Sequence, residues 1–88
     1  MTLQMIANEL SLDRVMQTLK RLFGKFDLFA HWTQGEFHHD LVFVLPKEQD
    51  VFDGNVLVVS TNCNGGVKDV LNFDSVPDRY ALWKLPLS

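Results

Sequence analysis

The residues best suited to chemistry lie around Gln34-Gly35, a pair typical of a two-residue turn between β-strands. When the flanking strands are registered on that turn, His31 faces His38, and Asp40 lies on the same face two residues farther along. Two imidazoles and a carboxylate can hold a transition metal ion with an open coordination position. An imidazole beside a carboxylate can also act as a general acid or base near neutral pH.

This histidine pattern matches no established metal-ligand spacing, and it depends on the inferred register. A simpler interpretation is two partly exposed histidines at the tip of a hairpin, with Asp40 solvated or paired with one of them. In the same register His39 points toward the core, where we expect it to be hydrogen-bonded. We therefore predict neither a bound metal nor a cofactor, and keep catalysis by His31, His38 and Asp40 as an alternative.

A second candidate site is the loop Asn62-Cys63-Asn64-Gly65-Gly66, which contains the one cysteine of the chain. A nucleophilic thiol needs a pKa lowered by a histidine, a cation or a helix N-terminus, and no histidine is adjacent to Cys63 in the sequence. The glycines fit neither a P-loop nor a dinucleotide-binding pattern. We expect a structural turn. The alternatives are a ligand-binding loop, which would form an anion nest if a helix followed, and a reactive thiol.

Two further groups of residues can be interpreted in more than one way. Asp74, Asp78 and Arg79 could recognise a polar ligand, but they are also ordinary turn residues. The large aromatic residues Trp32, Tyr80 and Trp83 are enriched at interface hot spots as a class, and they are also common in the cores of small sheets. We favour the turn and the core.

The clearest secondary-structure element is a helix over residues 12–23. Ser11 can cap its start and Gly24 can end it in the left-handed conformation. Residues 3–6 could form a short strand or an early helical turn. The apolar face of the helix follows a spacing of three and four residues: Leu12, Val15, Met16, Leu19, Leu22 and Phe23.

After Gly24 the apolar residues alternate as in β-strands, and turn residues separate the strands. Tight turns join antiparallel neighbours. The sequence therefore predicts one α+β domain over residues 1–88, in which one N-terminal amphipathic helix packs on a mostly antiparallel sheet of about five strands. The predicted strands are 26–33, 37–45, 55–61, 67–73 and 79–85, with a short helix as the alternative for 67–73.

One helix of about twelve residues cannot cover a sheet of five strands. The uncovered face would carry Phe29, Val42 and Val44, and a large exposed apolar patch is unusual on a monomer. We therefore expect a homodimer or another protein partner on that face. The leading functional hypothesis is a non-enzymatic interaction module. The alternative is a small ligand- or metal-binding domain, which could be an enzyme, that uses His31, His38, Asp40 and residues 62–66.

Charge and composition narrow the classes of partner. The chain has 88 residues, eight basic and eleven acidic, and this acidic balance disfavours nucleic-acid binding. The exception is a basic helix face with Arg14, Lys20, Arg21 and Lys25, which could contact an anion. No apolar stretch is long enough to cross a membrane, and no basic residue precedes the first apolar positions as in a signal peptide. We therefore expect a cytoplasmic protein.

Overall fold

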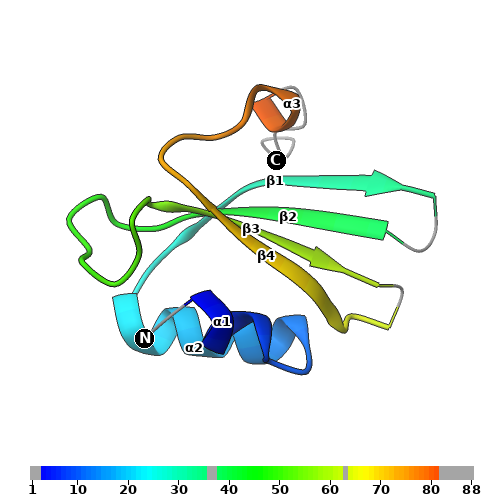
Figure 1. Ribbon diagram of the computed structural model, residues 1–88, viewed down its shortest axis with the longest axis horizontal. Helices are drawn as coiled ribbons and strands as arrows, with labels where there is room; N and C mark the ends of the chain where they lie inside the picture. Colours follow the sequence, from blue (N-terminus) through cyan, green and yellow to red (C-terminus); the bar gives the residue numbers. More distant parts are fainter. Residues whose placement is uncertain (1–2, 36–37, 63, 82–88) are drawn as a thin grey trace.

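The computed structural model describes residues 3–35, 38–62 and 64–81. Four strands form one antiparallel sheet in the order β1-β2-β3-β4, each paired with the next in the chain (Figure 1). The α+β fold predicted from the sequence is therefore confirmed, with four described strands in place of about five. The strands are β1 (Asp27–Gln34), β2 (His38–Val44), β3 (Val56–Thr61) and β4 (Val67–Phe73).

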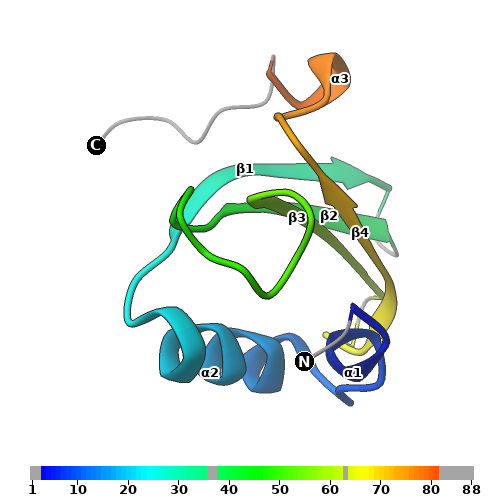
Figure 2. The ribbon, with the colours of Figure 1, turned by 60° about the vertical axis from the view of Figure 1, so that its left-hand side comes forward.

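Three described helices lie on opposite sides of this sheet. The helices α1 (Leu3–Ala7) and α2 (Leu12–Phe23) cover one face, and α3 (Asp78–Ala81) lies over the other (Figure 2). We call these the α2 face and the α3 face. Residues 3–6 thus belong to a short separate helix. No described helix is long and apolar enough to cross a membrane.

The helix α2 begins and ends where its capping residues predict. The Ser11 hydroxyl accepts a hydrogen bond from the backbone N–H of Arg14, and Gly24, at φ 75°, donates its N–H to the carbonyl of Lys20. Both bonds satisfy backbone groups that a helix end leaves unpaired. Val15 and Leu19 are fully buried, and Leu12 and Phe23 pack against the same core, whereas Met16 and Leu22 of the predicted face are each 38% exposed.

The main hydrophobic core lies between the helices and the α2 face. Its members include Ile6 of α1 and Phe52 of the loop between β2 and β3. Two threonines, Thr18 and Thr61, are also buried on this side, but most of the buried side chains are apolar, so burial of apolar surface contributes most to this face. The buried members are Ile6, Val15, Leu19, Leu41, Phe43, Leu45, Phe52, Leu57, Val59 and Val70.

A second, smaller core lies on the α3 face. Ala30, Val42, Val56 and Val58 project from the strands, and Tyr80 of α3 packs over them with only 2% of its surface exposed. The expected strand over residues 79–85 is therefore wrong for its first three residues, which are helical; residues 82–85 lie outside the described part. Short segments of this length fit a helical turn as well as a strand, and tertiary packing decides between them.

The expected hairpin register is also wrong. The structure pairs Gln34 with His38 and His31 with Leu41, so the connection has three residues in place of two. Gly35, the first residue of this connection, has a φ of 67°, in the left-handed region that glycine enters without steric penalty. The observed pairing is shifted from the expected one by an odd number of residues. Because side chains alternate between the two faces of a strand, this shift places His31 and His38 on opposite faces of the sheet.

Candidate functional site

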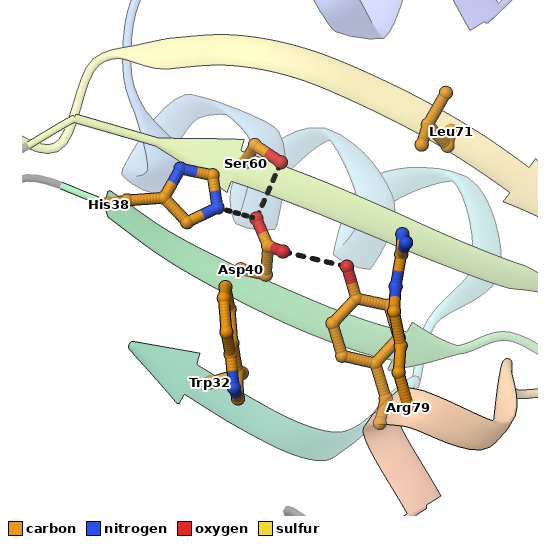
Figure 3. Close-up of a pocket in the computed structure, with 7 residues that line it drawn as sticks. Trp32, His38, Asp40, Ser60, Leu71 and Arg79 are labelled. Atoms are coloured by element: carbon orange, nitrogen blue, oxygen red, sulfur yellow. Dashed lines mark hydrogen bonds and ion pairs between the residues drawn. The ribbon is translucent and has the colours of Figure 1, made fainter. Parts of the chain in front are cut away.

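A buried carboxylate lies at the centre of the α3 face. Asp40 is only 5% exposed, and its two oxygens contact three polar side chains (Figure 3). The Ser60 hydroxyl donates to Oδ1 at 2.6 Å, and the Tyr80 hydroxyl donates to Oδ2 at 2.7 Å. Nε2 of His38 lies 2.9 Å from Oδ1. We call Asp40, His38, Ser60 and Tyr80 the carboxylate cluster.

The sheet register places the members of this cluster together. Asp40 on β2 is paired directly with Ser60 on β3. His38 lies two residues before Asp40, so the alternation of a strand puts both side chains on the same face. Tyr80 reaches the same carboxylate from α3, forty residues away in the chain. The cluster therefore joins β2, β3 and α3 through one charged group.

Hydrogen bonding determines the charge of the cluster. Burial alone would raise the pKa of Asp40, but hydrogen bonds from Ser60, Tyr80 and His38 stabilise the carboxylate and lower the pKa below its ordinary value. Burial also raises the pKa of Tyr80, and the bond to Asp40 raises it further, against an opposing effect of Arg79. At neutral pH Asp40 is therefore ionised, and Tyr80 is a protonated donor to it.

A pocket of about 390 Å³ opens beside the carboxylate cluster. Besides the four cluster residues, it is lined by Trp32 of β1, Leu71 of β4 and Arg79 of α3, so all four strands and α3 contribute to it. The Arg79 guanidinium lies 4.7 Å from the centre of the Tyr80 ring. Trp32 meets His38 edge to face, with ring centres 5.6 Å apart. Aromatic, cationic and hydrogen-bonding groups therefore surround one cavity (Figure 3).

Of the expected histidine and aspartate site, the structure brings only His38 and Asp40 together. His31 lies on the α2 face, where its Nε2 is 3.1 Å from Nδ1 of His39. His39 also lies on the α2 face, as expected, but it contacts His31 at the end of the sheet and stays half-buried. A cooperative site of His31, His38 and Asp40 is therefore not formed.

The loop over residues 62–66 is described except for Cys63. The Asn62 side chain accepts hydrogen bonds from the backbone N–H groups of Asn64 and Gly66. The carbonyl of Gly65 accepts the N–H of Leu12 at the start of α2. These bonds shape a turn and satisfy a helix end. None of the described loop residues lines the pocket.

The face expected to be uncovered is covered in part by α3. Val42 is fully buried beneath the second core, so it cannot contact a partner. Phe29 and Val44 are half-buried, and Phe29 packs against the same core. Tyr80 of α3 covers part of this face, which the sequence did not predict.

The sequence analysis missed Ser60 and Leu71, and it did not connect Trp32, Arg79 and Tyr80 with Asp40. One signal was present: Ser60 follows four consecutive apolar residues of a central strand, where a buried hydroxyl needs a partner. No local signal points to Tyr80, because its contact with Asp40 depends on how the chain folds back after β4.

The described side chains form neither a catalytic triad nor a three-residue metal-ligand group. Ser60 donates to Asp40 and not to His38, so these residues do not form a nucleophile, base and orienting group in series. Among the described residues no three histidine, cysteine, aspartate or glutamate side chains are grouped to hold a metal ion. Comparisons with protein-family models, curated proteins and solved structures each give no match.

Proposed function

We propose that this domain binds a small molecule with an anionic group on a flat apolar body, in the pocket beneath α3. One observation carries the proposal: a guanidinium and an indole line the same cavity of about 390 Å³. Small-molecule sites have volumes of about 300 to 1,000 Å³ and combine apolar walls with a few polar groups. This pocket has that size and that composition.

Arg79 supports the anionic part of the ligand. Its side chain is exposed, and within residues 3–35, 38–62 and 64–81 no carboxylate forms an ion pair with it. Asp40 already accepts from Ser60 and Tyr80 and pairs with His38. A guanidinium is always charged and binds carboxylate or phosphate groups through two parallel hydrogen bonds. Arg79 is therefore placed to bind an anion.

Trp32 and Leu71 support the flat apolar part. They lie on β1 and β4, the two edge strands, so they form opposite walls of the pocket with the carboxylate cluster between them. Aromatic rings bury large apolar areas and stack in offset or edge-to-face geometry. A planar ring between these walls would place its anionic substituent near Arg79.

A titration followed by NMR tests this proposal with three compounds of one shape and different charge. Benzoate, benzyl alcohol and benzamidine share a benzene ring and carry a negative, neutral and positive group. We expect benzoate to shift the amide resonances of Trp32, Ser60 and Leu71 most strongly. The proposal is wrong if benzamidine binds best, or if no compound perturbs the pocket.

Two arginine variants sharpen the test. Arg79→Gln should remove the preference for benzoate over benzyl alcohol, because the amide lacks the charge and the planar fork. Arg21→Gln is the matched control, since Arg21 is an exposed arginine of α2 on the other side of the sheet. It should leave the preference unchanged.

Self-association is a second candidate function, supported by the half-buried Phe29 and Val44 on the α3 face. It has less support than ligand binding, because Tyr80 and Val42 form a core where an open apolar surface was expected. Size-exclusion chromatography with light scattering at micromolar concentration tests it. A dimer that Phe29→Ser converts to a monomer would support this candidate, and a monomeric wild-type chain would eliminate it.

A further inference from the structure

His31 and His39 form a close pair on the α2 face, at the hairpin end of the sheet. Nε2 of His31 lies 3.1 Å from Nδ1 of His39, and the two ring planes are inclined by 35°. We infer that this pair is a binding site for one divalent transition metal ion, with Zn²⁺ or Ni²⁺ as the chemical class. The inference is independent of the pocket and of the function proposed for it.

The backbone holds the two rings in place. His31 is paired with Leu41, and His39 with Thr33, so the histidines are diagonal neighbours on one face of two hydrogen-bonded strands. His39 belongs to an interior strand, since β2 is also paired with β3. Sites built on strands hold their ligands more rigidly than sites on loops. Little ordering is therefore needed when an ion binds.

The distance between the nitrogens fits one ion. With metal–nitrogen bonds of about 2.05 Å, a separation of 3.1 Å corresponds to a nitrogen–metal–nitrogen angle of about 98°. That angle lies between the values of about 90° for octahedral and about 109° for tetrahedral coordination. Both lone pairs must then turn from the shared proton toward the ion, by rotation about the side-chain torsions of the two histidines.

The protons can be placed for both states. Without metal, one proton lies between the two nitrogens, because one imidazole must donate and the other accept. With metal bound, Nε2 of His31 and Nδ1 of His39 are ligands, and each ring carries its proton on its other nitrogen. Binding therefore exchanges one hydrogen bond for two coordination bonds.

The remaining coordination positions face solvent. His31 is exposed, so an ion can reach the pair directly. Within the described part of the chain no third histidine, cysteine, aspartate or glutamate joins the group. Imidazole ligands suit zinc, copper and nickel, and they are poor ligands for magnesium and calcium.

Isothermal titration calorimetry with NiCl₂ and with ZnCl₂ at neutral pH tests the site on the full chain. We expect one ion per chain, and no heat from MgCl₂. Loss of a second-shell partner weakens metal affinity about 10- to 100-fold, so His31→Gln and His39→Gln should each weaken it at least about tenfold. Absence of nickel and zinc binding to the wild-type chain would overturn the inference.

The third histidine provides a matched control. His38 is paired with Asp40 on the opposite face, so His38→Gln should bind nickel as the wild type does. If His38→Gln loses binding while the other two variants keep it, the ion binds at the carboxylate cluster and the inference is wrong.

Paramagnetic broadening gives a second readout that does not depend on the folding of any variant. Ni²⁺ added to the wild-type chain should broaden the amide resonances of Thr33 and Leu41, which are paired with the two histidines. The resonances of Leu71 and Arg79 on the other face should stay sharp. Broadening of Ser60, Leu71 and Arg79 with sharp resonances for Thr33 and Leu41 would contradict the site.

Discussion

The two faces of the sheet are stabilised by different kinds of interaction. On the α2 face, two helices, a loop and the strands bury ten apolar side chains, and the one buried charged residue of the described chain, Asp40, lies on the other face. On the α3 face, five residues form a small core, and a buried carboxylate beside it accepts a hydrogen bond from Tyr80 of the short helix α3. Apolar burial is nondirectional, whereas hydrogen bonds to a carboxylate require particular donors at particular positions.

This difference explains why the candidate ligand site is on the α3 face. A helix of four residues covers little of the sheet, so space remains between α3 and the strands. The carboxylate cluster holds α3 over that space through a few directional bonds. The α2 face is packed by larger elements that fill it with aliphatic and aromatic side chains.

The largest expected effect is on the α2 face. Phe43 is fully buried there, and Phe43→Ala should lower the free energy of unfolding by about 3–5 kcal/mol, because it removes apolar contacts and leaves a cavity. Urea denaturation followed by circular dichroism measures the loss. Met16→Ala, at a position 38% exposed, is the control and should change the free energy by less than about 0.5 kcal/mol. A small effect of Phe43→Ala would contradict the assignment of this face as the main core.

A smaller effect is expected where one polar bond is removed from the α3 face. Tyr80→Phe keeps the ring but deletes the hydroxyl that donates to the Asp40 carboxylate. Loss of a hydrogen bond to a charged group should lower the free energy of unfolding by about 1.5–3 kcal/mol. Ser75→Ala removes an exposed hydroxyl just before α3 and serves as the control. Equal stability of Tyr80→Phe and wild type would mean that the α3 face is held by apolar contact alone.

The free energy of unfolding should depend on pH through Asp40 on the α3 face. The folded state lowers the pKa of Asp40, so the unfolded state takes up a proton more readily. The contribution of Asp40 is present above the unfolded pKa of about 3.9 and is lost as pH falls through the lower folded pKa. Asp40→Asn should therefore be less stable than wild type at neutral pH, and the gap should narrow in acid. Urea denaturation of both proteins at several pH values between neutral pH and strong acid measures this difference in the free energy of unfolding. A difference that does not change with pH would refute the assignment of Asp40 as ionised.

The smallest stability effect is expected at the pocket rim. Arg79 is exposed and lies over the Tyr80 ring, so Arg79→Gln should cost no more than about 1 kcal/mol, the range of exposed cation–π contacts. The same variant should lose its preference for benzoate. A loss of stability as large as that of Tyr80→Phe would show that Arg79 is a structural residue of the α3 face.

The sequence predicts the elements of this protein better than their relative placement. Ser11 and Gly24 mark the ends of α2 because capping is a local interaction. The sheet follows from alternation and turn residues, which are also local. The hairpin register was mispredicted because two- and three-residue loops use glycine in similar ways, and the choice between them decides the face of every side chain.

The candidate site was only partly predictable for the same reason. His38 and Asp40 were proposed together because a spacing of two residues puts them on one face of any strand. His31 was assigned to the wrong face with the register. Tyr80 and Arg79 were placed in a fifth strand, so their approach to Asp40 could not be inferred.

The sequence by itself therefore determined the α+β class, the helix α2 with its apolar face, and the excess of apolar residues over what that helix could cover. Only the tertiary structure decided which histidines are neighbours and what covers the second face. Pairing across strands and the return of α3 depend on contacts between residues far apart in the chain. Their energies come from packing and from burial of a charge, which no local pattern records.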